Sequence, residues 1–244
     1  MITMSTLGYN GRFGNQLFQY CYAKALARKL NTTLQIPKNW IGRQIFNIDD
    51  EEIRVRLPQG RLDEGADNRD IVGYFQYGEL EGGKYYLPYS KSDIKNWLVF
   101  KDSIIKKYAI HYKPFVYHIR RYNDDTRYAN ILPIAYIDEI REHNEDFEQI
   151  GIVDKNELLL QTEIDFLYDF FTLMYSKILY RSNSTFSWWA ATLGDINHGL
   201  LTYSPVVEDR VGKIDNINFV LGNHPKMASS KYHSSKLTDL WIKQ

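Results

Sequence analysis

Apolar side chains recur with helical spacing in two stretches of the first half of the chain. Those within 17–26 fall on one face of a helix, which predicts an amphipathic helix that ends at Asn31. Residues 92–108 repeat the pattern and predict a second helix. β-Prone runs at 2–7 and 32–37 flank the first helix, so this half of the chain alternates strand and helix.

The second half of the chain alternates in the same way. A strand-like run begins at Phe115, and Pro133 starts a helix, because its fixed φ suits a first helical turn. This alternation predicts an α/β fold with two parallel-sheet lobes. The tail beyond Val206 has no clear periodicity until 237–242. The other predicted elements are strands at 147–154, 177–181 and 199–205 and helices at 165–176 and within 185–194.

A boundary between the two predicted lobes falls at the HYKP stretch, residues 111–114. We therefore expect an N-terminal lobe over 1–112 and a C-terminal lobe over 113–244. In the N-terminal lobe, the pattern degrades over 39–68 into short β-like pieces mixed with charge and glycine, which indicates a loop-rich region.

Composition narrows the functional classes. Lys plus Arg and Asp plus Glu both number 30, so the formal charge is zero and the chain lacks the basic excess of a nucleic-acid binder. The single Cys21 excludes an intrachain disulfide framework and a cysteine-based zinc site. No apolar run reaches the roughly 18 residues of a membrane span, and the N-terminus lacks a signal-peptide core. We expect a cytoplasmic protein.

Two adjacent arginines follow the strand that begins at Phe115. Arg120 and Arg121 carry permanent charges and planar donor forks that match phosphate oxygens, and ligands of open α/β sheets bind beyond the carboxyl ends of strands. The pair is therefore a candidate pyrophosphate clamp. The alternative is an edge strand whose basic residues are simply solvated.

Two further stretches place polar groups where a helix begins. Gly11 and Gly14 lie in the turn before the first helix and permit close backbone approach to a ligand, although this is not the dinucleotide fingerprint. The alternative is an ordinary strand-to-helix connection. The cluster 182–185 precedes another helix, where hydroxyls, N–H groups and the helix dipole favour a phosphate or ribose. Plain N-capping is the rival explanation, and both can hold. Trp188 and Trp189 are predicted to be core residues.

Together these stretches resemble the family-11 glycosyltransferases, the inverting α-1,2-fucosyltransferases. The resemblance rests on GRFGNQLFQY near the N-terminus, HIRR at the start of the second half and NSTFSWWAA after a strand. GYFQ at 73–76 and the PIAYI helix start are similar to further family features. The resemblance implies a GT-B fold of two Rossmann-like lobes with parallel sheets facing a central cleft. It also implies GDP-fucose as donor, a sugar hydroxyl as acceptor, expected to be the 2-hydroxyl of galactose, and no metal or other cofactor.

The same resemblance implies roles for individual residues. Arg120, His118 and Asp124 would form the catalytic group, with Arg120 gripping the donor diphosphate. The N-terminal lobe would face the acceptor and the C-terminal lobe would bind the GDP-sugar. A metal-free enzyme must neutralise the departing GDP with protein donors, which suits two arginines and a helix N-terminus. The implied donor-binding residues are Arg12, Gly14, Asn15, Gln16, Arg121, Asn123, Asn183, Ser184, Thr185, Phe186 and Ser187.

The chain departs from the family pattern in three places. The family motif continues with Gly-Asp after the arginines, whereas Tyr122 and Asn123 stand here and the acid is displaced to Asp124. The Ser-Asp-Asp stretch that usually follows a later strand is missing, and 39–68 matches weakly. Three hypotheses therefore stand: a fucosyltransferase acting on a glycan acceptor, a transferase using another GDP-sugar, and a catalytically silent sugar-nucleotide or glycan-binding protein.

Overall fold

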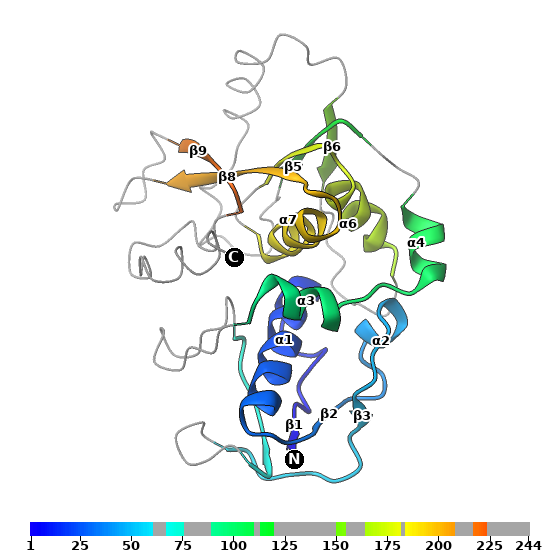
Figure 1. Ribbon diagram of the computed structural model, residues 1–244, viewed down its shortest axis with the longest axis vertical. Helices are drawn as coiled ribbons and strands as arrows, with labels where there is room; N and C mark the ends of the chain where they lie inside the picture. Colours follow the sequence, from blue (N-terminus) through cyan, green and yellow to red (C-terminus); the bar gives the residue numbers. More distant parts are fainter. Residues whose placement is uncertain are drawn as a thin grey trace. The chain divides into compact units, whose positions relative to one another are not determined.

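The computed structural model of the chain describes residues 1–60, 67–75, 89–109, 113–119, 150–154, 164–181, 184–207 and 217–223. These residues form two compact units, and each has its own sheet (Figure 1). Unit 1 is built mainly from Met1–Ile105, and unit 2 holds most of the described chain from Lys106 onward. The boundary between 112 and 113 that the sequence suggests stays a prediction.

Unit 1 contains a sheet of four short strands in the order β3-β2-β1-β4. All three strand pairings are parallel, with Ile2 opposite both Leu34 and Arg69. The predicted strands at 2–7 and 32–37 are confirmed in shortened form. The strands are β1 (Ile2–Thr3), β2 (Leu34–Ile36), β3 (Glu51–Glu52) and β4 (Arg69–Asp70), and the helices between β1 and β3 are α1 (Phe13–Lys29) and α2 (Gly42–Ile45).

Helix α1 is confirmed, but it is buried on more than its apolar face. Gln16 and Gln19 are as buried as Leu17 and Phe18. Both amide atoms of Gln16 have hydrogen-bond partners, as burial of a polar group requires, and Gln19 Nε2 donates to a backbone carbonyl. The helix ends where Asn31 takes a left-handed φ of 49°, as asparagine tolerates.

The single helix predicted over 92–108 is wrong: two helices, α3 (Lys91–Trp97) and α4 (Asp102–Tyr108), occupy the region. Between them, the Val99 carbonyl accepts a hydrogen bond from the Asn47 N–H at 2.8 Å, and the Lys101 N–H donates to Ile45 O at 3.0 Å. Phe100 also forms a bridge with Phe46. Pairing with a distant segment therefore replaces the helical hydrogen bonds that local periodicity favours.

A capping box starts α3. Ser90 Oγ accepts from the Asp93 N–H at 3.1 Å, and Asp93 Oδ2 accepts from the Ser90 N–H at 2.8 Å. Arg28 forms a two-pronged ion pair with the same carboxylate. Burial alone would raise the pKa of Asp93, but the hydrogen bonds from Arg28 and Ser90 hold it below its ordinary value.

Asp93→Asn should destabilise the protein by about 1 kcal/mol at neutral pH, because it removes this charge-assisted cap. Since the folded pKa lies below the unfolded value of roughly 3.9, the contribution is present above that pH and is lost as pH falls through the folded value. Urea denaturation at pH 7 and near pH 2 measures the free energy of unfolding of the wild type and of Asp93→Asn. The gap between wild type and variant should shrink at low pH, and Asp102→Asn, in the exposed first turn of α4, serves as the control. An equal gap at both pH values would contradict the assignment.

Unit 2 contains a sheet of five strands in the order β6-β5-β7-β8-β9. The first three pairings in this order are parallel, and β9 joins the edge antiparallel to β8. The strands predicted at 147–154, 177–181 and 199–205 are confirmed, whereas β9 was not predicted. The elements are β5 (Phe115–Ile119), β6 (Ile150–Asp154), α6 (Phe166–Met174), β7 (Ile178–Tyr180), α7 (Thr185–His198), β8 (Leu201–Val207) and β9 (Ile217–Leu221).

Aromatic side chains of α6 and α7 fill the core of unit 2. Trp188 and Trp189 are at most 1% exposed and pack edge to face, with ring centroids 5.0 Å apart, so their predicted core position is confirmed. Phe186 packs edge to face on Phe170 at 5.2 Å. No helix in the described part of the chain is long and apolar enough to cross a membrane.

Candidate functional site

The strand order reverses once in each sheet, and ligands of open α/β sheets bind at the carboxyl ends of the strands beside such a reversal. In unit 1 the reversal lies between β1 and β4, because β2 and β3 follow on one side of β1 and β4 lies on its other side. In unit 2 it lies between β5 and β7. The glycine turn leaves the end of β1, whereas His118 lies at the end of β5 and Ser184 follows β7. The sequence-predicted candidates therefore lie at the reversal point of each sheet.

The turn after β1 depends on two glycines. Gly8 has a φ of 100° and Gly11 a φ of 78°, a region that favours residues without a Cβ. A Cβ on Gly11 would also lie only 3.0 Å from Cβ of Asn15 and closer still to its amide nitrogen. Gly11 is therefore required both by its backbone angle and by the close packing of Asn15.

Buried side chains hold this turn from beneath. Gln16 Nε2 donates to the carbonyls of Gly11 at 3.0 Å and of Gly8 at 3.3 Å, and Gln16 Oε1 accepts from the Trp40 indole N–H at 3.0 Å. Gln19 Nε2 donates to the Asn10 carbonyl at 2.6 Å. Three carbonyls of one exposed turn are thus fixed by amides from the buried part of α1.

A buried carboxylate fixes the start of the same turn. Asp70, at the end of β4, is 5% exposed and accepts hydrogen bonds from Thr3 Oγ1 at 2.7 Å and the Ser5 N–H at 2.8 Å. Its second oxygen accepts from Ser5 Oγ at 2.5 Å. Asp70 therefore joins the ends of β1 and β4, the two strands that flank the reversal point. Sequence reasoning missed this residue, because its partners lie more than sixty positions away in the chain.

The structure separates the unit 1 candidates by exposure. Gly14 and Gln16 are buried, whereas Arg12 and Asn15 are half-buried. Arg12 is the N-cap residue of α1, and its carbonyl accepts from the Asn15 N–H at 2.8 Å. Arg12 and Asn15 keep partly exposed side chains at the turn, while Gln16 is bonded to the turn itself.

In unit 2, His118 is fully buried at the end of β5. Its ring lies 6.2 Å from the ring of Phe186, in the first turn of α7. Because β5 and β7 are parallel neighbours, His118 supports the start of α7 from the adjacent strand. This position suits a residue that orients its neighbours.

Two serines form hydrogen bonds with the backbone at the start of α7. Ser184 is the N-cap, and its Oγ accepts from the Phe186 N–H at 3.3 Å, so the plain capping explanation holds here. Ser187 Oγ donates to the Ser184 carbonyl at 3.2 Å, and Thr185 is half-buried. Five of the sequence-predicted site residues, Arg120, Arg121, Asn123, Asp124 and Asn183, lie outside the described residues.

Arg181 is a second residue that sequence reasoning missed. It follows β7 directly and is 1% exposed, and its Nε donates to Ser204 Oγ at 2.9 Å. Ser204 Oγ in turn donates to the Gly222 carbonyl at 2.8 Å. The arginine therefore places a buried guanidinium beside Ser204 of β8, at the end of β7. The sequence signal that could have identified Arg181 is a basic residue between a β-prone run and a polar helix start.

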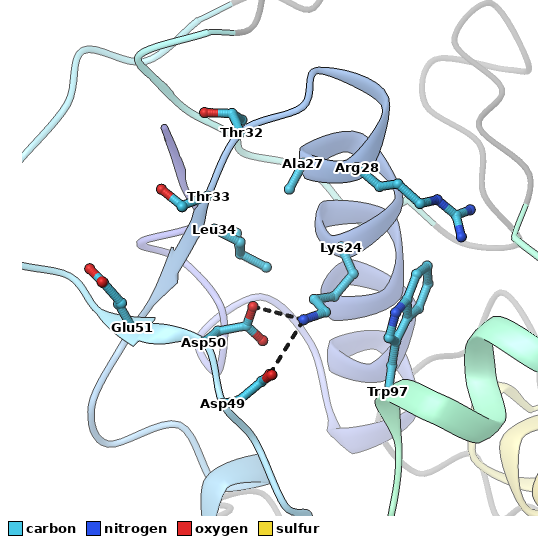
Figure 2. Close-up of a pocket in the computed structure, with 10 residues that line it drawn as sticks. All are labelled: Lys24, Ala27, Arg28, Thr32, Thr33, Leu34, Asp49, Asp50, Glu51 and Trp97. Carbon is cyan, nitrogen blue, oxygen red and sulfur yellow. Dashed lines mark hydrogen bonds and ion pairs between the residues drawn. The ribbon is translucent and has the colours of Figure 1, made fainter.

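A depression of about 330 Å³ lies elsewhere on unit 1, among α1, the start of β2 and the residues before β3 (Figure 2). Lys24 Nζ lies 2.9 Å from Asp50 Oδ1 and 3.5 Å from Asp49 Oδ1. Tyr20 donates to Asp50 Oδ2 at 2.6 Å, and burial, with the Asp50 charge, raises the tyrosine pKa. Leu34 and Glu51 begin their strands, so the depression lies at the amino ends, away from the glycine turn. The ion pairs of Lys24 with Asp49 and Asp50 join α1 to the chain before β3.

Within the described residues, no group of three or more His, Cys, Asp or Glu side chains could hold a metal ion. The groups at the described parts of the two reversal points are backbone amides, hydroxyls and carboxamides, with the buried Asp70 carboxylate in unit 1 and the buried His118 and Arg181 side chains in unit 2. Such groups bind neutral hydroxyl-rich ligands and phosphates through hydrogen bonds.

Comparison with known proteins supports the fold. No protein-family model matches the sequence, and no curated protein is similar to it. Among solved structures, the chain is similar to the α-1,6-fucosyltransferase NodZ soaked with GDP-fucose, at a TM-score of 0.50 and 12% identity over 91% of this chain and 98% of that one. A NodZ structure from Bradyrhizobium gives a TM-score of 0.51 at the same identity and coverage.

A second fucosyltransferase fold is also similar to the chain. POFUT1 in complex with GDP-fucose has a TM-score of 0.50 and 14% identity over 80% of this chain and 94% of that one. At such identities the likeness establishes the fold alone. The predicted α/β fold of GT-B type with parallel sheets is therefore confirmed.

Proposed function

We propose that this protein is an inverting glycosyltransferase that moves L-fucose from GDP-fucose to a hydroxyl of a glycan. The observation that carries the proposal is the location of the candidate residues. His118 and Ser184 lie at the reversal point of a sheet whose fold resembles that of NodZ and POFUT1, each solved with GDP-fucose. The family-11 resemblance, and with it the 2-hydroxyl of galactose as acceptor group, belongs to the same proposal.

In this proposal, unit 2 holds the donor and unit 1 receives the acceptor. An acceptor oxygen attacks C1 of fucose from the face opposite the diphosphate, and the bond from C1 to the phosphate oxygen breaks. GDP departs with the bonding electrons, and the proton of the acceptor hydroxyl passes to solvent water. Arg120, Arg121 and the N-terminus of α7 neutralise the charge that develops on GDP, without a metal ion. His118 orients the arginine pair from its buried position, and Ser184, Thr185 and Ser187 shape the phosphate side of the site.

The supports for this proposal come from separate observations. The chain that follows β7 contains a buried arginine and then a capped helix N-terminus, which together make a positive environment for a phosphate. In unit 1, the glycine turn after β1 keeps Arg12 and Asn15 partly exposed, as contacts to a ligand require.

Asn123 in place of the family acid motivates the alternative of a silent binding protein.

The first test is a calorimetric titration with GDP, GDP-fucose and GDP-mannose in the presence of EDTA. We expect micromolar binding of GDP and GDP-fucose without metal, because protein donors carry the phosphate charge. An assay for release of GDP from GDP-fucose then measures turnover with and without a glycan.

Each outcome of that titration points to one hypothesis. Equal or tighter binding of GDP-mannose would favour a transferase for another GDP-sugar. Binding without GDP release in the presence of any glycan tested would favour the silent binding protein. If none of the three GDP compounds binds, all donor hypotheses are refuted. If they bind only when a divalent cation replaces EDTA in a repeat titration, the metal-free site is refuted.

A further inference from the structure

The glycine turn of unit 1 presents an aromatic side chain to solvent. Tyr9 is 72% exposed, more than any other large hydrophobic side chain among the described residues. It follows β1 and therefore lies at the carboxyl end of the sheet. Single exposed aromatic residues are common and need no explanation by themselves. Tyr9 differs from such residues because hydrogen bonds hold the chain on both sides of it.

The backbone on both sides of Tyr9 is fixed from below. The preceding carbonyl of Gly8 and the following carbonyls of Asn10 and Gly11 accept hydrogen bonds from the buried amides of Gln16 and Gln19. The Tyr9 N–H itself donates to the Thr6 carbonyl at 3.0 Å. Loss of hydrogen bonds from buried carboxamides is costly, so these bonds hold the turn in the conformation observed.

The outer end of the side chain is fixed as well. Asn39 Nδ2, from the chain that follows β2, donates to the Tyr9 hydroxyl at 3.1 Å. The ring is thereby held between the ends of β1 and β2, with most of its surface open to solvent. An exposed side chain normally retains its rotamer freedom, and restraint before binding lowers the entropy lost when a ligand docks.

We propose that Tyr9 is the platform on which the saccharide acceptor stacks, with Asn39 as the residue that sets the angle of the ring. This inference rests on the proposed function, because that function defines the acceptor. A held aromatic face can pack against the C–H face of a sugar ring, and neighbouring carboxamides can pair with its hydroxyls. Asn10 supplies such a neutral group in the turn, and Asn39 lies beside the ring.

The test compares wild type with Tyr9→Ala, Tyr9→Phe and Asn39→Ala. Ligand-observed NMR measures the binding of lactose, N-acetyllactosamine and chitobiose, and calorimetry measures the binding of GDP. For whichever saccharide the wild type binds, Tyr9→Ala should weaken binding by about tenfold or more, and Tyr9→Phe and Asn39→Ala by about threefold, because these two keep the ring. Tyr168→Ala removes an exposed tyrosine from α6 and serves as the matched control, and thermal melts confirm that each variant folds.

The outcomes separate this inference from the proposed function. Absence of saccharide binding by wild type, or equal saccharide affinity in Tyr9→Ala, would overturn the platform. A parallel loss of GDP affinity in Tyr9→Ala would place the ring against the nucleotide and overturn it too. If wild type binds saccharides through Tyr9 but binds no GDP compound, the platform stands and the proposed donor fails.

Discussion

Replacing Arg120 with alanine should reduce the rate of fucose transfer by at least about a hundredfold, because removal of one donor that stabilises transition-state charge costs that much or more. Arg120 follows the last residue of β5, the strand that flanks the reversal point of unit 2. Its charge would oppose the negative charge that grows on GDP as the bond to fucose breaks. The measurement is GDP release from GDP-fucose in the presence of a glycan acceptor.

Two further variants make this test specific. Arg120→Lys keeps the positive charge but loses the planar fork, so we expect an activity between those of wild type and Arg120→Ala. Arg54→Ala removes an exposed arginine of unit 1 and should leave the rate unchanged. Full transfer activity in Arg120→Ala would show that the diphosphate is bound elsewhere. A loss of GDP binding with no effect on turnover per bound donor would limit Arg120 to ground-state binding.

Replacing Gln16 with leucine should destabilise the protein by about 3 kcal/mol, because the buried Trp40 indole N–H and two part-buried carbonyls of the turn lose a partner at once. The side chain is 1% exposed and bonds the carbonyls of Gly8 and Gly11 and the indole of Trp40. Leucine has a similar size but can offer none of these hydrogen bonds. Chemical denaturation monitored by circular dichroism gives the free energy of unfolding.

The matched control for Gln16→Leu is Gln44→Leu, in the exposed part of α2, which should change stability by less than about 0.5 kcal/mol. A loss of less than about 1 kcal/mol in Gln16→Leu would mean that water or neighbouring groups replace the amide easily. The turn would then lack the rigidity that we assign to it, and Tyr9 would lose its fixed position.

Local pattern was sufficient for most of the regular elements. The apolar spacing in 17–26 and 165–176 identified α1 and α6, because one buried face per helix leaves a periodic trace in the sequence. The same rule failed over 92–108, where the pattern is helical but Val99 pairs with Asn47 and Lys101 pairs with Ile45. It also missed β9, a short strand whose sheet partner among the described residues is β8, a pairing that the tertiary fold sets.

The candidate site was predictable only in part. Glycines and helix-start hydroxyls are local signals, so the turn after β1 and the start of α7 could be located from the sequence. The hydrogen-bond partners of those groups could not be located from the sequence. Asp70 contacts Thr3 and Ser5 from β4, and Arg181 contacts Ser204 on the neighbouring strand β8. These partners are far apart in the chain, so no spacing along it encodes the contacts.

By itself, the sequence determined which side chains must be buried and where the chain must turn, since hydrophobic spacing and glycine angles act over a few residues. Tertiary structure alone decided the strand order and therefore the reversal points at β1 and β5. It also turned Gln16 toward the turn instead of toward solvent, because a buried amide bonds whatever partners the fold brings within reach. Strand pairing and buried polar contacts join residues far apart in the chain, so they exist only once the chain has folded.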